Sequence, residues 1–191
     1  MIPLTELAHN LIREVLRPGD AAIDATAGNG YDTQFLAETV GIDGIVYAFD
    51  IQPAAITMTA QRLAAAGLTN CRLILGSHAG LQTELPLGSR PIKAVMLNLG
   101  YLPGGDKQQT TCTETTLAAI HQGLALMSGG GIMTVLAYTG HFGGADEATE
   151  VERLLNTLPA DHFQVFEPAP ASGKKNAPRL FVVLKSDRTP A

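Results

Sequence analysis

The chain has 191 residues, of which 46% are hydrophobic and 16% charged, a composition typical of a folded globular protein and not of a disordered one. This length allows one domain with a substantial core, so we expect residues 1–191 to form a single domain. Thirteen Lys and Arg against eighteen Asp and Glu give a formal net charge of −5, which disfavours nucleic-acid binding through a broad basic face.

The sequence lacks the signals of membrane insertion, secretion and disulfide bonding. No apolar run approaches the ~20 residues that span a bilayer, and the N-terminal segment carries an early acid, Glu6, and no basic region. Cys71 and Cys112 suggest neither a disulfide framework nor a zinc site, so we expect both thiols to be buried and no metal to be bound. These features predict a cytoplasmic protein with no membrane partner.

Helix-like and strand-like segments alternate along the chain, which predicts an α/β fold with a mostly parallel sheet and helices on both faces. In chain order the predicted elements are helix 4–16, strand 21–25, helix 32–40, strand 44–49, helix 52–66, strand 71–75, strand 92–97, helix 113–127, strand 132–137, helix 145–158, strand 163–166 and strand 180–184. The last two strands have no helix between them, so we expect an antiparallel pair at the edge of the sheet.

A glycine-containing turn follows the first predicted strand. Gly28, Asn29 and Gly30 let a ligand approach the backbone closely and expose the N–H groups of the next helix. Asp50 closes the second predicted strand twenty residues later, where a carboxylate can accept hydrogen bonds from both hydroxyls of a ribose. Together they predict a site for a nucleoside-containing cofactor.

The residues of this turn distinguish between two classes of cofactor. The nicotinamide and flavin fingerprint requires a third glycine where this chain has Thr33. Asp24, at the start of the turn, would repel a pyrophosphate but can help to hold an ammonium group, directly or through water. S-adenosylmethionine has an ammonium group, a sulfonium and a ribose but no phosphate, so it is the predicted cofactor.

Two later strand ends carry further candidate residues. Ser77 and His78 follow the third predicted strand, where they can bind an adenine base or its ribose. Asn98 and Tyr101 follow the fourth. A side-chain amide oxygen can accept an N–H of an amine and so aim its lone pair for an in-line methyl transfer, while an aromatic ring can pack against a flat base. This loop resembles the Asn-Pro-Pro-Tyr loop of amino-directed nucleic-acid methyltransferases.

Four motifs resemble those of the rRNA methylase family, whose characterised members are the YtqB/MnmM-type tRNA methyltransferases. They are residues 24–33 (DATAGNGYDT), 49–52 (FDIQ), 98–107 (NLGYLPGGDK) and 138–144 (YTGHFGG). The resemblance implies a class I S-adenosylmethionine-dependent fold and no metal. It also implies methylation of the aminomethyl nitrogen of 5-aminomethyl-2-thiouridine at the tRNA wobble position.

The same resemblance assigns residues to the two halves of the site. The positions that match cofactor contacts are Asn29, Asp32, Asp50, Gln52, Ser77 and His78, and the positions that match the substrate side are the loops 98–106 and 138–141, with Tyr138 and His141. His141 and Asp106 are alternative acceptors for a proton of the substrate ammonium. A basic cluster is predicted to contact the phosphates of an anticodon stem-loop: Lys174, Lys175 and Arg179, next to Asn176, with Lys107 and either Arg90 or Lys93 nearby.

Other interpretations stay open. An S-adenosylmethionine-dependent methyltransferase of rRNA or of a small-molecule amine would have the same cofactor site, and the acidic net charge favours the small molecule. A noncatalytic cofactor-binding module is a further alternative. The sequence leaves the oligomeric state open, and a homodimer is compatible with it. The acids Asp146, Glu147, Glu150 and Glu152 are expected to be exposed at the start of a helix, where the macrodipole favours them.

Overall fold

The computed structural model describes residues 2–85, 90–100, 102, 110–168 and 177–187. Its helices are α1 (Leu4–Arg13), α2 (Tyr31–Val40), α3 (Pro53–Ala65), α4 (Leu81–Glu84), α5 (Thr113–Leu126) and α6 (Gly144–Leu155), with a 3-10 turn, η1 (His78–Gly80), before α4. Its strands are β1 (Ala21–Asp24), β2 (Ile45–Asp50), β3 (Cys71–Leu75), β4 (Ile92–Leu99), β5 (Met127–Ala137), β6 (Phe163–Phe166) and β7 (Arg179–Lys185).

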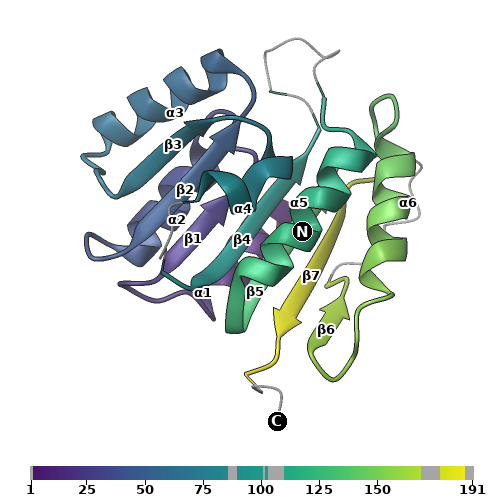
Figure 1. The fold of residues 1–191 in the computed structure, drawn as a ribbon. Helices are drawn as coiled ribbons and strands as arrows, with labels where there is room; N and C mark the ends of the chain where they lie inside the picture. The colour runs from purple at the N-terminus through teal and green to yellow at the C-terminus, as the bar shows by residue number, and fades with distance from the viewer. Residues whose placement is uncertain (1, 86–89, 101, 103–109, 169–176, 188–191) are drawn as a thin grey trace.

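These strands form one sheet in the order β3-β2-β1-β4-β5-β7-β6. Strands β1 to β5 run parallel, and β7 lies antiparallel to both β5 and β6. In Figure 1 the arrows of β1 and β4 accordingly point towards one edge of the sheet and the arrow of β7 points towards the other. The predicted α/β class, the parallel majority and the antiparallel C-terminal pair are confirmed.

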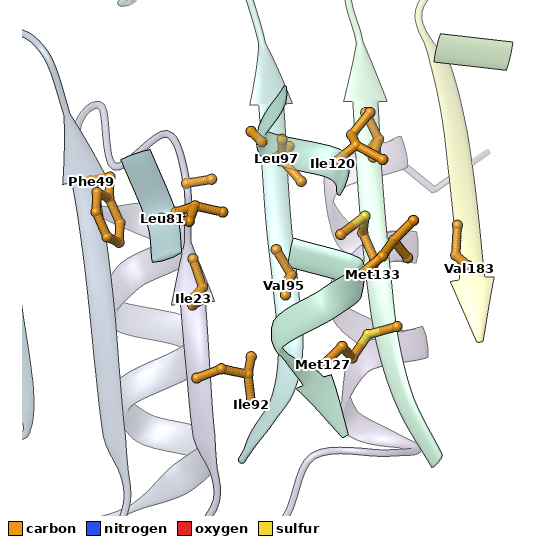
Figure 2. Close-up of a cluster of buried hydrophobic side chains, with 14 of the residues drawn as sticks. Ile23, Phe49, Leu81, Ile92, Val95, Leu97, Ile120, Met127, Met133 and Val183 are labelled. Atoms are coloured by element: carbon orange, nitrogen blue, oxygen red, sulfur yellow. The ribbon is translucent and has the colours of Figure 1, made fainter. Parts of the chain in front are cut away.

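Two apolar cores cover the two faces of the sheet. On one face, Leu81, α5 and α6 pack against the inward side chains of the strands; Figure 2 shows Val95, Leu97 and Met133 beside Ile120 of α5. On the other face, α1, α2 and α3 pack through residues such as Ile12, Leu36 and Leu63. The central strands are therefore buried on both sides, which explains their continuous apolar sequences.

Two local expectations were wrong. Residues 129–131 were expected to end a helix, but they lie inside β5, which begins at Met127 directly after α5. Cys112 was expected to be buried and is exposed, because it lies at the start of α5 and outside both cores. Cys71 is partly buried, and burial raises the pKa of its thiol to about 12.

Gly30 joins the glycine turn to α2 and contacts α3. Its φ is +79°, and a Cβ at this position would lie 2.9 Å from the Cα of Thr59. The turn can therefore approach the backbone of α3 this closely only with glycine at position 30. Thr59 completes the contact, because its hydroxyl donates to the carbonyl oxygen of Gly28 at 3.2 Å.

Gly30→Ala is expected to lower the free energy of unfolding by about 3 kcal/mol, the sum of left-handed backbone strain and a contact with backbone that cannot move aside. Gly19→Ala is the matched control, because Gly19 has a φ of +89° but a Cβ there would meet nothing within 4 Å beyond its chain neighbours. It should cost about 1–2 kcal/mol, from strain alone. Urea unfolding of both variants measures the difference, and equal losses would show that the contact with Thr59 is unimportant.

Candidate active site

The candidate site lies where the carboxyl ends of the parallel strands meet. Strands β1, β2, β3 and β4 are neighbours in the sheet and run in the same direction, so the residues that follow them gather at one edge (Figure 1). In open α/β sheets this edge is the usual ligand site. It brings together Asp24, Asp50, Ser77 and Asn98, which are far apart in the sequence.

Asp24 forms the floor of the glycine turn. Its side chain is wholly buried; its Oδ1 accepts the backbone N–H of Thr26 at 3.1 Å, and its Oδ2 accepts the Thr33 hydroxyl at 2.6 Å. Burial, helped by the negative charges of Asp32 and Asp50, raises the pKa of this carboxyl to about 7. The structure thus gives Asp24 a role in holding the turn, and its contact with a cofactor amine stays a prediction.

Asp24→Asn is expected to stabilise the protein without ligand at about pH 8. Because the folded pKa exceeds the ordinary value of 3.8, the native state retains a proton that the unfolded chain loses, so stability falls as pH rises from about 4 to about 7. An amide is neutral throughout: its oxygen can accept the N–H of Thr26, and its NH₂ can donate to the Thr33 hydroxyl, which reverses that bond. Unfolding in denaturant should show a gain of about 2–4 kcal/mol at pH ~8 that vanishes near pH ~4.

The exposed acid Asp43 supplies the control for that measurement. Asp43→Asn should leave the unfolding free energy nearly unchanged at both pH values, since surface substitutions usually change it by less than about 0.5 kcal/mol. A loss of stability in Asp24→Asn at pH ~8 would mean that the native state favours the ionised carboxylate, which contradicts a raised pKa of Asp24.

Asp50 ends β2 and joins the glycine turn to the start of α3. Its Oδ2 accepts the N–H of Gly28 and its Oδ1 accepts the N–H of Gln52, both at 2.9 Å. A carboxylate has about four lone-pair positions, so each oxygen can still accept one hydroxyl. The half-buried side chain thus has the capacity that binding of a ribose diol requires.

The remaining residues of the turn also fit S-adenosylmethionine. Asn29 has its carbonyl oxygen bound to Arg62 Nε at 2.7 Å, while its buried Oδ1 has no hydrogen-bond partner among the residues that the structure describes. A buried acceptor of this kind requires a donor, and an ammonium or hydroxyl group supplies one. With three carboxylates nearby, Asp24, Asp32 and Asp50, the site favours a cationic ligand without phosphate.

Ser77 and His78 lie at the end of β3, as predicted, but His78 is directed into the protein. Its ring is 8% exposed, its Nε2 lies 3.2 Å from the hydroxyl of Thr115 on α5, and burial lowers the pKa of the imidazole. The Ser77 side chain accepts the N–H of Ala79 and caps η1. Contacts of these two residues with an adenosine therefore stay predictions.

Asn98 occupies the end of β4 beside the acidic turn. Its backbone N–H donates to the hydroxyl of Thr26 at 2.7 Å, and its side-chain Nδ2 donates to Asp32 Oδ2. Asp32 also accepts from His9 of α1, whose Nε2 lies 2.5 Å from Oδ1. Tyr138 directly follows β5 and is 43% exposed; partial burial and the negative charge of Asp32 raise the pKa of its phenol.

His141 lies at the same edge, in the loop between β5 and α6. Its Nδ1 is 3.0 Å from the carbonyl oxygen of Phe142 and 3.5 Å from the hydroxyl of Thr110. The ring lies beside Gly100, two residues after Asn98, because a Cβ added to Gly100 would be 3.7 Å from the Nε2 of His141. The structure thus brings His141 close to the β4 loop, where the predicted role as a proton acceptor is possible.

Glu147, in the first turn of α6, is connected through Thr111 to the loop that follows Asn98. It was expected to be exposed, but it is only 2% exposed and accepts hydrogen bonds from the hydroxyls of Thr111 at 2.9 Å and Thr116 at 2.7 Å. The Thr111 hydroxyl in turn accepts the N–H of Gly100 at 2.9 Å. Glu147 therefore links α6 to Thr116 of α5 and, through Thr111, to Gly100 in the loop that follows Asn98.

The structure also corrects the expectation for Arg179. Its guanidinium makes a bidentate pair with Glu152 at 2.8 Å and binds Glu167 as well, so its charge is compensated within the protein. These carboxylates raise the pKa of the guanidinium, and Arg179 lowers the pKa of Glu152. Arg179 is thus a structural link between α6 and β7 and not an uncompensated cation of the basic cluster, and its contact with a phosphate stays a prediction.

Two other basic residues considered for RNA lie at the opposite edge of the sheet. Lys93, near the start of β4, donates to the carbonyl oxygen of Gly129 at 2.8 Å, and Arg90 donates to the carbonyl oxygens of Gly19 and Asp43. Neither can join a site at the carboxyl ends of the strands. The other predicted substrate and RNA residues lie outside the described residues: Tyr101, Asp106, Lys107, Lys174, Lys175 and Asn176.

A surface hollow of about 570 Å³ lies between α2 and α3. Asn29 lines it together with Gln34, Met58 and Arg62, but the acids at the strand ends do not. The candidate site is therefore defined by the strand-end residues and not by this hollow. Within the described ranges, no cluster of three or more His, Cys, Asp or Glu side chains could hold a metal ion, and no helix is long and apolar enough to cross a membrane.

The strand order, the glycine turn and the acid at the end of β2 define the class of the fold: it is the fold of class I S-adenosylmethionine-dependent methyltransferases. Residues 46–184 match the model of the family described as "Putative rRNA methylase", and the chain belongs to this family. This family assignment confirms the resemblance found in the four motifs.

Individual relatives extend this comparison. The chain is 38% identical over 164 residues to the chloroplastic tRNA (mnm(5)s(2)U34)-methyltransferase of Arabidopsis thaliana, a match that covers 81% of this chain and 60% of that protein. The chain therefore spans less than two thirds of the plant enzyme. A crystal structure described as that of a "putative rRNA-methylase" from Clostridium thermocellum superposes with a TM-score of 0.91 at 35% identity, covering 97% of this chain and 98% of that one.

A protein of Streptococcus mutans described as "a putative methyltransferase", solved in complex with SAH, superposes with a TM-score of 0.86 at 33% identity. The match covers 97% of this chain and 99% of the bacterial one. The fold similarity thus extends over nearly the whole chain.

Proposed function

We propose that this protein transfers a methyl group from S-adenosylmethionine to the aminomethyl nitrogen of a modified wobble uridine in tRNA, converting 5-aminomethyl-2-thiouridine to its methylaminomethyl form. The observation that carries the proposal is the side-chain amide of Asn98, which lies next to the acidic cofactor turn at the end of β4. The name of the Arabidopsis relative supports the same nucleoside as substrate.

The residues of the chain have separate tasks in this reaction. When bound, S-adenosylmethionine supplies an electrophilic methyl group on a sulfonium, which keeps the electron pair of the bond that breaks. Asp50 binds the ribose and Asn29 supplies an acceptor for a donor group of the cofactor. Asn98 accepts an N–H of the neutral amine and directs its lone pair at the methyl carbon, so positioning provides most of the rate acceleration.

The acidic strand ends contribute electrostatically to the same step. The amine nitrogen becomes positively charged when it takes the methyl group. The carboxylate of Asp32 is close to this point, because it accepts a hydrogen bond from the side chain of Asn98. A fixed negative charge near a developing positive charge stabilises the transition state. The proposal includes contacts of Lys107, Lys174 and Lys175 with the phosphates of the tRNA backbone. Such a small contact area is compatible with a net charge of −5.

The test uses tRNA from a strain that lacks the gene. Nucleoside mass spectrometry should detect accumulated 5-aminomethyl-2-thiouridine, and purified protein with S-adenosylmethionine should convert it to the methylated nucleoside in that tRNA. Unchanged nucleosides in the deletion strain, together with no transfer to tRNA in vitro, would overturn the proposal. Transfer to rRNA or to free amines instead would assign one of the alternative substrates.

A further inference from the structure

Three residues from three separate elements form a hydrogen-bonded chain that ends at the amide of Asn98. His9 lies in α1, Asp32 in the first turn of α2, and Asn98 at the end of β4. Asp32 Oδ1 lies 2.5 Å from His9 Nε2, and Asp32 Oδ2 accepts from Asn98 Nδ2. Only 19% of the His9 side chain and 14% of the Asp32 side chain are exposed.

This chain determines which way the Asn98 amide points. An ionised carboxylate can only accept hydrogen bonds, so the group of Asn98 that faces Asp32 must be its NH₂. The amide oxygen therefore points away from Asp32 and remains able to accept an N–H from a substrate. Since the backbone N–H of Asn98 is also held, by the Thr26 hydroxyl at 2.7 Å, both ends of the residue are fixed.

His9 in turn holds the carboxylate of Asp32 in one orientation. Its ring stacks on Phe35 with centroids 3.8 Å apart and planes 9° from parallel, and Phe35 is 6% exposed in the core under α2. A ring held against a buried ring cannot rotate freely, so its Nε2 keeps its direction towards Asp32. A hydrogen-bonded pair of this kind orients the group beyond it, as a third residue orients the base in many enzymes.

We propose that His9 and Asp32 are positioning residues for methyl transfer: the pair holds the Asn98 amide with its oxygen towards the amine. The proposal rests on the proposed function and adds a role that differs from the cofactor contact predicted for Asp32. It assigns His9, from the N-terminal helix, to the active site.

The kinetic test compares substitutions at both positions. Asp32→Asn should lower kcat by about 10²-fold, because an amide at position 32 can donate and no longer dictates which group of Asn98 faces it. His9→Ala should lower kcat by about 10-fold, and His9→Gln, which can place a donor near the same point, should restore much of that loss. The Kd for S-adenosylmethionine, measured by calorimetry, should stay within about 3-fold in both His9 variants.

A double variant that also lacks the Asn98 amide distinguishes a positioning role of His9 from a general loss of structure. The double variant His9→Ala/Asn98→Ala should be no slower than Asn98→Ala alone, because His9 acts through that amide. His121→Ala is the matched control, since His121 is an exposed histidine on α5, on the opposite face of the sheet; it should keep full activity. Additive losses in the double variant, or weaker cofactor binding with unchanged kcat, would overturn the proposal.

Amide exchange of the Asn98 side chain can be measured without an activity assay, so its result tests the positioning role independently of the proposed function. In NMR spectra of the wild-type protein, the side-chain NH₂ of Asn98 should exchange slowly with solvent, and His9→Ala should speed that exchange about 10-fold or more. Slow exchange lost in His9→Ala supports the positioning role even if tRNA proves not to be the substrate. Exchange that is equally fast in both proteins would overturn it.

Discussion

Asn98→Ala is expected to lower kcat for methylation of tRNA by about 10²–10³-fold while leaving the Kd for S-adenosylmethionine almost unchanged. The amide is bound by Asp32 and the backbone N–H by Thr26, so the residue is held in one position before substrate arrives. Removing a pre-positioned polar group that acts on the reacting atom has an effect of about this size. Single-turnover kinetics with undermethylated tRNA measures the methyl-transfer step directly.

Asn156→Ala is the matched control for that substitution. Asn156 is an exposed asparagine at the C-cap of α6, so its replacement should leave the single-turnover rate as in the wild type. Thermal unfolding of both variants then distinguishes loss of catalysis from loss of structure. Full activity of a folded Asn98→Ala variant would remove the amide from the mechanism.

Asp50→Ala is expected to weaken binding of S-adenosylmethionine by about 10²–10³-fold. The carboxylate accepts N–H groups from Gly28 and Gln52 and has capacity left for two ribose hydroxyls. Hydrogen bonds to a charged group contribute about 1.5–3 kcal/mol each, so losing two of them costs about 3–6 kcal/mol, and the expected change lies in the lower part of that range. Isothermal titration calorimetry with the purified variant measures it.

The adenosine half of the cofactor provides a second readout for this variant. Adenosine shares the ribose but lacks the sulfonium and the amine, so Asp50→Ala should weaken its binding by a similar factor. Asp43→Ala, at an exposed acid in the turn before β2, should change neither affinity. Wild-type affinity of Asp50→Ala for both ligands would place the ribose elsewhere.

The fold was predictable because its strands are short apolar runs buried on both faces. The range 71–75 was predicted with the bounds that β3 has, and most other elements agree within a few residues. The start of β5 was not predictable from glycine content, because residues 129–131 look like a helix terminator. The structure includes them in β5 as an irregular stretch between Met127, which pairs with Ile92, and Ile132, which pairs with Ala94.

The strand-end part of the site was also predictable, since parallel strands must bring their following residues to one edge. Asp50 and Asn98 were identified in this way, and the structure places both there. His9 was missed because its partner lies 23 positions away, and a single histidine on an amphipathic helix gives no local signal of that partner.

The environments of Glu147 and Arg179 were not predicted. The sequence contains a pattern that indicates burial of Glu147 but none that indicates the partners of Arg179. Acids at a helix start are usually exposed, yet Glu147 shares the inward face of α6 with Ala148, Val151 and Leu155, a spacing visible in the sequence. Arg179 was grouped with two lysines that are its neighbours along the chain. Its partners, Glu152 and Glu167, are close only in the folded sheet, so charge clustering alone could not assign it.

The position of β7 has a consequence for synthesis and folding. Of the seven strands in the described sheet this one is made last, yet it lies inside the sheet, between β5 and β6. Until the ribosome has released residues 179–185, β5 has a bare edge with unpaired N–H and C=O groups, and β6 has no neighbour. The nascent chain therefore has an open, aggregation-prone edge until β7 pairs, and a chain that ends just before residue 179 should be insoluble.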